Sequence, residues 1–351
     1  MNFKFYKILF LNFFFLKHTI YAYHIFSALV PVAMVYNPGP NYSLINSVDY
    51  HPKQHLFCMT CTQNDMVVIY KINAAGKPEI VQSLSNPLAK LCKPQHAVFS
   101  PDGEKIVVAN WRNQTLSVYQ RTKEEKFQNE PAAIISPSSS LIKHKPHGIA
   151  FSPCGKYLAI AYGAATYRGK AIALFKVAND GLNFELSHLL EAELPGIPKG
   201  ITFSPDGTCL LVTFSDINQL VIFNLTQDGK TILPTPQQVI HGDESGISRP
   251  EDVKISPCGN YCAVSNSDRD TVTFYPFDKT ANLITQCIPC AILQNPDANF
   301  HFPHGIAFSP DGAFLLVTEF GQVDVTTDGG IVWDHKTRPE QSKINLYDLR
   351  D

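Results

Sequence analysis

The stretch HGIAFSPDG at residues 304–312 is one of six copies of the same unit in this 351-residue chain. The other copies are HAVFSPDG from His96, HGIAFSPCG from His147, KGITFSPDG from Lys199, EDVKISPCG from Glu251 and a degenerate SVDYHPKQ from Ser47. Their turn prolines recur at intervals of 49 to 53 residues, at Pro52, Pro101, Pro153, Pro205, Pro257 and Pro310. Six copies at a near-constant period are the sequence signature of a repeat architecture.

Each copy sits inside the same series of strand-like runs. The unit itself alternates and ends in Ser-Pro-Asp-Gly, where proline presets the turn and glycine tolerates its last position. A second run follows, such as KIVVAN at residues 105–110, then a third rich in β-branched and aromatic residues, such as MVVIYKI at 66–72. A looser fourth run is PEIVQSL at 78–84, and no amphipathic helix interrupts the series. Four short strands in about 50 residues predict one blade of an all-β propeller.

The number of blades depends on how the N-terminus is interpreted. Dividing the chain length by a period of about 52 residues gives about seven units, so we expect seven blades with an incomplete first one. In support, HTIYAYHI from His18 matches DMVVIYKI from Asp65. The apolar segment 1–28 then belongs to the first blade, and residues 29–351 form the rest of the propeller. The alternative is six blades closed by a strand near Val32–Tyr36, with 1–28 a signal-like extension.

Composition narrows the function classes. Charged residues make up 17% of the chain, the net charge is −2, and no basic stripe is visible, which argues against a nucleic-acid partner. The apolar run from Ile8 to Leu16 is too short to span a bilayer. The nine cysteines include two Cys-x-x-Cys pairs in strand-like stretches, which predicts buried thiols in a reducing compartment rather than zinc half-sites. We therefore expect a cytoplasmic protein, or a secreted or periplasmic one if the N-terminus is a signal peptide.

Aligning the units on the turn proline separates core positions from a polar ring. Residues two and four before the proline are apolar in every unit and predict the packing between blades. Residues five and six before it are mostly polar and differ from unit to unit; the ones we select are Gln95, His96, His147, Lys199, Glu251, Asp252 and His304. They start the innermost strand, so we expect them at one mouth of the central channel, the usual ligand site of a propeller. No local spacing indicates a metal site, and we expect no metal and no other cofactor.

The units resemble those of the lactonase-type seven-bladed propellers, the family of bacterial 6-phosphogluconolactonase and the muconate-lactonizing enzymes. The motif PQHAVFSPDG at residues 94–103 carries this resemblance, together with the glycine turns at 177–181 and 225–229. The resemblance implies a lactone-opening site built from His, Arg and Glu around the channel mouth. Gln95 stands where that family's Pro-Arg-His motif has arginine.

Two functions remain open on the sequence alone. The first is a monomeric binding or scaffold propeller whose mouth takes a small polar ligand or a protein partner, with Gln95, His96, Asp252 and His304 in contact with it. The alternative is a lactone hydrolase, in which Glu251 or His147 is the base and Lys199 or Arg249 stabilises the oxyanion.

Overall fold

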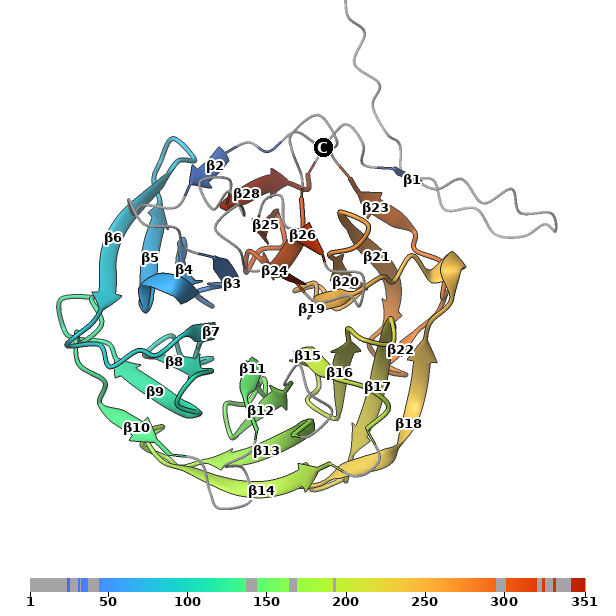
Figure 1. Cartoon of the computed structure of the whole chain (residues 1–351), viewed down its shortest axis with the longest axis horizontal. Helices are drawn as coiled ribbons and strands as arrows, with labels where there is room; N and C mark the ends of the chain where they lie inside the picture. The colour runs from blue at the N-terminus through green and yellow to red at the C-terminus, as the bar shows by residue number, and fades with distance from the viewer. Residues whose placement is uncertain are drawn as a thin grey trace, which may run out of the picture.

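Six small sheets surround one axis in the computed structural model, which gives the molecule the shape of a propeller (Figure 1). The structure describes residues 24–25, 31, 33–36, 44–136, 144–163, 169–191, 194–294, 301–320, 324–325, 331–332 and 342–350. The first two blades are β3 (Ile45–Tyr50), β4 (Leu56–Cys61), β5 (Met66–Ile72) and β6 (Pro78–Ser85), then β7 (Pro94–Phe99), β8 (Lys105–Asn110), β9 (Thr115–Gln120) and β10 (Ala133–Ile135). The next two are β11 (Pro146–Phe151), β12 (Tyr157–Tyr162), β13 (Ala171–Val177) and β14 (Phe184–Leu190), then β15 (Pro198–Phe203), β16 (Cys209–Phe214), β17 (Gln219–Leu225) and β18 (Ile232–Ile240). The fifth is β19 (Pro250–Ile255), β20 (Tyr261–Asn266), β21 (Thr271–Asp278), β22 (Leu283–Ile284) and β23 (Ala291–Leu293).

The sixth blade is closed by the N-terminal part of the chain. It contains β24 (Pro303–Phe308), β25 (Phe314–Glu319), β28 (Lys343–Asp348) and β2 (Ala33–Tyr36). Strand β2 is antiparallel to β28, so the two ends of the propeller share one sheet. The all-β propeller is thus confirmed, and the described residues form six blades, as the alternative expected.

The described residues do not form the expected seventh blade. Strand β1 (His24–Ile25) does not start a blade of its own but pairs in parallel with β23 of the fifth blade. The connection between β25 and β28 contains a small hairpin of β26 (Asp324–Val325) and β27 (Ile331–Val332). Most of the segment 1–28 lies outside the described residues, so its assignment stays a prediction.

The repeated turn has the hydrogen bonds that its sequence predicts. In the second blade, the Gly103 N–H donates to the Ser100 carbonyl at 2.8 Å, and Gly103 adopts a left-handed φ of 82°. The Ser100 hydroxyl in turn accepts the Lys105 N–H at 2.9 Å. The same pair of bonds recurs at Ser152, Ser204, Ser256 and Ser309. Each copy of the motif therefore fixes how the innermost strand of a blade turns into the next one.

The core lies between neighbouring blades. The residues four before each turn proline are fully buried, from Val48 in the first blade to Ile306 in the sixth. They belong to clusters that join adjacent sheets, such as the one that packs Ile201 and Val212 of the fourth blade on Ile172 of the third. Burying each large apolar side chain contributes about 1.5–3 kcal/mol, so this column stabilises the ring.

The prediction of buried thiols holds for the first Cys-x-x-Cys pair and is wrong for the second, where Cys287 is exposed and Cys290 is half-buried, because residues 285–290 form a connection and not a strand. All nine lie among the described residues, and none of them is in a disulfide. Both members of the first Cys-x-x-Cys pair, Cys58 and Cys61, are buried in β4. In the described part of the chain, no helix has the length and apolarity needed to cross a membrane.

Candidate functional site at the channel mouth

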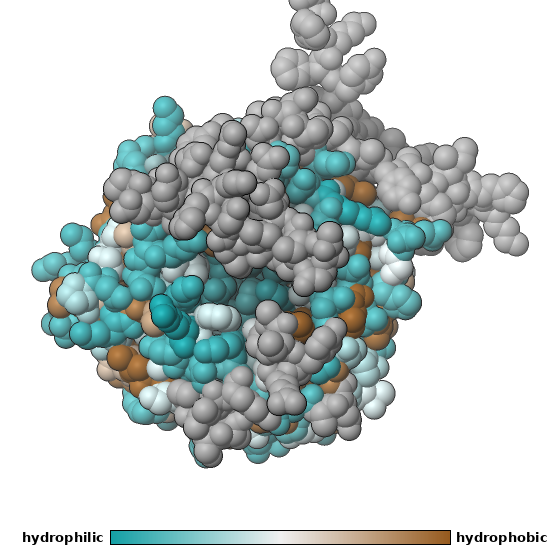
Figure 2. Space-filling model, in the orientation of Figure 1, coloured by the Kyte–Doolittle hydropathy of each residue, from teal (hydrophilic) through white to brown (hydrophobic). Residues whose placement is uncertain are grey.

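A bulge at the start of each innermost strand places the polar ring. In β11 the pairing with β12 is in register at Pro146 and again from Ile149, and it shifts between them. The same shift occurs at the start of β3, β7, β15, β19 and β24. A bulge re-aims the side chains that it contains. Here the shifted residues are the ones that line the channel, and on the face shown in Figure 2 hydrophilic residues surround the central hollow.

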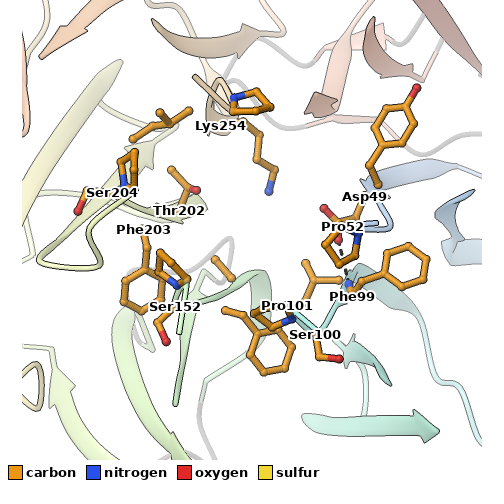
Figure 3. Close-up of a pocket in the computed structure, with 18 of the residues that line it drawn as sticks. Asp49, Pro52, Phe99, Ser100, Pro101, Ser152, Thr202, Phe203, Ser204 and Lys254 are labelled. Carbon is orange, nitrogen blue, oxygen red and sulfur yellow. Dashed lines mark hydrogen bonds between the residues drawn. The ribbon is translucent and has the colours of Figure 1, made fainter. Parts of the chain in front are cut away.

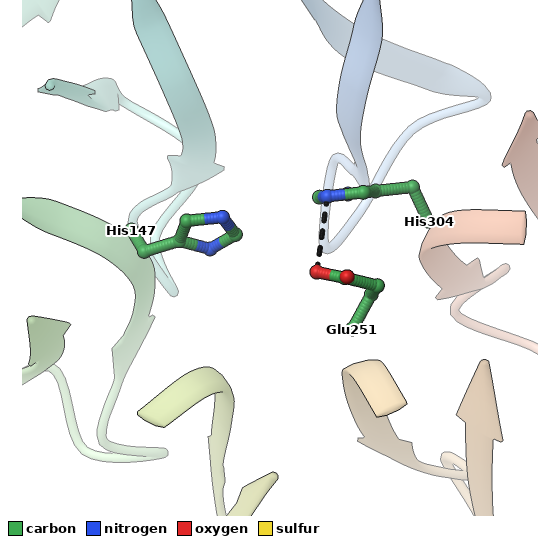
Figure 4. Close-up of side chains that lie close together, drawn as sticks. All are labelled: His147, Glu251 and His304. Atoms are coloured by element: carbon green, nitrogen blue, oxygen red, sulfur yellow. Dashed lines mark ion pairs between the residues drawn. The ribbon is translucent and has the colours of Figure 1, made fainter. Parts of the chain in front are cut away.

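Four of the predicted residues meet at the mouth. The Lys199 ammonium donates to His147 Nε2 at 3.2 Å and forms an ion pair with Glu251 Oε2 at 3.6 Å. His304 Nε2 lies 3.3 Å from the same carboxylate oxygen. Figure 4 shows His147, Glu251 and His304 pointing toward one another from three different blades. The four residues follow one another in the sequence at intervals of 52 or 53 residues, about one period, so only the closed ring brings them together.

The charges of this cluster set its protonation. Burial alone would raise the pKa of Glu251, but the Lys199 ammonium and the contact with His304 offset this and hold it well below its ordinary value. Burial lowers the pKa of His147 well below its ordinary value, and Lys199 lowers it further. At neutral pH the site therefore contains a carboxylate fixed between cations and a neutral imidazole that accepts a hydrogen bond.

Arg249 joins the cluster from the residue before β19. Its guanidinium lies 3.8 Å from Glu251 Oε1 and 3.8 Å from Asp268 Oδ1. Its backbone has a left-handed φ of 46°, and its N–H donates to Asn218 Oδ1 of the neighbouring blade at 2.7 Å. The backbone hydrogen bond to Asn218 holds Arg249 in place, and its guanidinium carbon lies 5.8 Å from the centre of the Phe302 ring. Together these contacts direct the side chain toward Glu251.

The remaining predicted residues form the waist of the channel, around a cavity of about 10 Å³. His96 is buried, and its Nδ1 accepts the Ile149 N–H of the next blade at 2.8 Å. Asp252 Oδ2 accepts the Ile306 N–H at 3.1 Å in the same way. Gln95 Oε1 accepts from the Asn46 amide. His96 and Asp252 therefore connect adjacent blades, in addition to facing the channel.

A second, larger cavity of about 370 Å³ lies beyond the waist, toward the Ser-Pro-Asp-Gly turns. Figure 3 shows that Lys254 and Asp49 reach into it from different blades, among apolar and turn residues. Asp49 Oδ2 accepts the Phe99 N–H at 2.8 Å, and Lys254 forms an ion pair with Asp252 at 3.8 Å. Burial raises the pKa of Asp49 to about 6, although Lys254 opposes the shift.

Replacing Asp49 with asparagine should change how stability depends on pH. The folded-state pKa is above the ordinary 3.8, so its contribution to stability is full below about pH 4 and is lost as pH rises through about 6. Asparagine keeps an acceptor for the Phe99 N–H and removes the titration. We compare the free energy of unfolding of Asp49→Asn with that of wild type at each pH. We expect the variant to be about 1–2 kcal/mol more stable, relative to wild type, at pH 7.5 than at pH 4. Urea unfolding at both pH values measures this.

The exposed aspartate Asp243 provides the matched control, because Asp243→Asn should leave the difference between the two pH values unchanged. Equal pH profiles for wild type and Asp49→Asn would contradict the prediction.

The sequence reasoning missed several side chains. Phe320 stacks on His304 with centroids 4.4 Å apart, and Phe302 stacks on Phe320 at 5.3 Å, so an aromatic pair walls one side of the mouth. Asp49 and Lys254 were also missed. Both stand three residues before the turn proline, a column that is otherwise apolar or small apart from Thr202, and this charged exception could have signalled the second cavity.

Comparison with known proteins identifies the family. The family model described as "Lactonase, 7-bladed beta-propeller" matches residues 42–248, which is more than half of the chain. The chain belongs to this lactonase family. The matched range contains His147 and Lys199, whereas Arg249, Glu251 and His304 follow it. The family is described as seven-bladed, while the described residues of this member form six blades.

The relatives of this lactonase-family chain are distant. It is 22% identical over 186 residues to proteins named 6-phosphogluconolactonase from Yersinia pestis (strain Pestoides F) and Yersinia pseudotuberculosis serotype O:1b (strain IP 31758). The alignment covers 52% of this chain and 53% of each relative, so the chain spans about half the length of the curated relatives it matches.

Solved structures share its fold at low identity. A putative 6-phosphogluconolactonase from Bacteroides uniformis ATCC 8492 has 16% identity and a TM-score of 0.59, covering 83% of this chain and 84% of that one. The Pseudomonas aeruginosa periplasmic gluconolactonase PpgL has 16% identity and a TM-score of 0.57, covering 82% and 83%. A luciferin-regenerating enzyme has 11% identity and a TM-score of 0.60, covering 88% and 92%. At these identities the likeness concerns the fold alone.

Proposed function

We propose that this protein hydrolyses lactones at the channel mouth. The observation that carries the proposal is the pair formed by a neutral imidazole and an ammonium group, His147 and Lys199, in a member of the lactonase family. Opening a cyclic ester needs a base that activates water and a cation that holds the oxyanion. Lys199 and Arg249 are the more accessible charges of the cluster, with 25% and 19% of their side chains exposed, whereas Glu251 is 3% exposed.

The contacts favour one assignment of roles. When substrate binds, Lys199 donates its hydrogen bond to the carbonyl oxygen of the lactone instead of to His147. The lone pair of His147 Nε2 is then free to accept a proton. His147 then takes a proton from the attacking water, Lys199 and Arg249 stabilise the tetrahedral oxyanion, and the protonated imidazole returns the proton to the ring oxygen as the C–O bond breaks. The product is a hydroxy acid.

Glu251 has a supporting role in this proposal. Its low pKa makes its carboxylate a weak base, because a base should have a pKa near the working pH. Its ion pairs with Lys199, Arg249 and His304 instead hold these groups around the position of the oxyanion. Glu251 is therefore a positioning residue.

The test is proton release from a panel of aldonolactones, with and without a phosphate group, by the purified full-length chain. The assay is run slightly below neutral pH, where spontaneous opening is slow. We expect release above the spontaneous rate in proportion to the enzyme concentration. If no lactone is turned over while a lactone or hydroxy acid still binds, the hydrolase proposal fails and the binding propeller is the better description.

Three other expectations stay predictions: the monomeric state, a protein partner at the channel face and the cytoplasmic location.

A further inference from the structure

Three buried side chains of the mouth form a donor set suited to a divalent metal ion. The ligand atoms of His147, Glu251 and His304 lie within 4.8 Å of one another (Figure 4), and those farther apart than about 3.4 Å must move closer when one ion binds them all. The closest pair, His304 Nε2 and Glu251 Oε2, is 3.3 Å apart, which is close to the edge of a tetrahedron of ligands around zinc. Two imidazoles and one carboxylate, with a fourth position open, are a ligand set that Zn²⁺ takes in proteins.

The surroundings orient these ligands as a metal site does. A metal-bound histidine almost always donates its other ring N–H to a carbonyl or carboxylate. His304 does so here, because its Nδ1 lies 2.7 Å from the Asn46 carbonyl oxygen, which directs Nε2 toward Glu251. His147 Nε2 accepts from Lys199, so this nitrogen presents a lone pair to the same space.

Two further buried atoms at this place lack hydrogen-bond partners. His96 Nε2 and Asn46 Oδ1 have none within the part of the chain that the structure describes. The side chains of His96 and Asn46 are about 95% buried, and both line the waist cavity together with the three ligand residues. Unsatisfied buried polar atoms are costly, so a water molecule or an ion bound in this small cavity would stabilise the site by satisfying them.

Lys199 supplies a positive charge within the same cluster. Its ammonium lies 3.2 Å from one ligand atom and 3.6 Å from another, so it places a positive charge beside the position that a metal would take. A quarter of this side chain is exposed, which leaves it a path out of the site. We infer that His147, Glu251 and His304 form a Zn²⁺ site in which the metal and the Lys199 ammonium compete for the same ligands.

The inference is tested by zinc binding to the full-length chain after treatment with a chelator, followed by calorimetry. We expect one Zn²⁺ per chain in wild type. Lys199→Met removes the competing charge at similar length and should bind zinc at least about tenfold more tightly. His304→Ala removes a ligand and should weaken binding by more than about 100-fold. A gain of affinity that keeps one Zn²⁺ per chain and shows no thiolate ligand cannot come from misfolding, which would expose the cysteines, so the methionine variant keeps the test decisive.

Two controls separate this site from others. His301 also lies near the mouth but pairs with Asp270 at 3.3 Å, so His301→Ala should leave zinc binding unchanged. Cysteine thiolates also bind zinc, and Co²⁺ distinguishes them from the proposed site, because a nitrogen and oxygen set gives visible d–d bands without a thiolate charge-transfer band. Zinc affinity that is equal in wild type, Lys199→Met and His304→Ala would overturn the inference. Because binding is measured without substrate, this result would leave the hydrolase proposal intact.

Discussion

Replacing Lys199 with methionine should lower kcat/KM for lactone hydrolysis by about 10²–10³-fold, the usual cost of losing one donor to an oxyanion. Methionine has nearly the length of lysine and packs as well, so the fold should be kept. Most of the loss should fall on kcat, because the charge on the carbonyl oxygen develops only in the transition state. Steady-state rates on the best lactone of the panel, measured without zinc, give the answer.

The matched control is a lysine outside the site. Lys230 is exposed in the turn after β17 and pairs only with Asp228 among the residues described, at 3.1 Å, so Lys230→Met should retain full activity. Lys199→Arg keeps the positive charge but replaces a compact ammonium with a planar guanidinium. This variant should therefore recover only part of the activity that Lys199→Met loses. If Lys199→Met hydrolyses the lactone at the wild-type rate, the oxyanion is stabilised elsewhere.

The repeat explains why the fold could be predicted from the sequence. Every Ser-Pro-Asp-Gly copy has the turn bonds that its residue types require, and the apolar columns on either side occupy the core between blades. These are local features, set by a few neighbouring residues. Blade number is a property of the closed ring, and it depended on whether residues near Val35 pair with β28 or begin a new sheet. The local sequence does not determine which of these two strand pairings forms.

The sequence predicts which residues make up the candidate site, but not how their side chains lie relative to one another. The pseudo-symmetry axis must gather equivalent positions, so the ring of His147, Lys199, Glu251 and His304 followed from alignment of the repeats. Which of them touch depends on the bulges and on side-chain direction. The nearness of two histidines to Glu251 is an example, because these residues are one or two repeats away along the chain and no short sequence motif indicates a metal site.

Substituting Gly148 with alanine should cost at least about 3 kcal/mol of unfolding free energy. A Cβ at this position would lie 2.2 Å from the Lys199 carbonyl oxygen, which is backbone of the adjacent innermost strand and cannot move aside without shifting β15. The φ of Gly148 is not in the left-handed region, so the cost comes from the close approach of two blades and not from backbone strain. The midpoint of urea unfolding measures the loss.

Gly76 offers the comparison that isolates this effect. It has a left-handed φ of 74° and nothing within 4 Å of an added Cβ, so Gly76→Ala should cost only the backbone strain, about 1–2 kcal/mol. Gly148→Ala carries a second consequence, because the residue that it would displace is Lys199. If the two innermost strands move apart, the 3.2 Å contact between His147 and Lys199 lengthens, and lactone hydrolysis should fall along with stability. An alanine variant as stable as Gly76→Ala would show that β11 and β15 are not packed as closely as the structure has them.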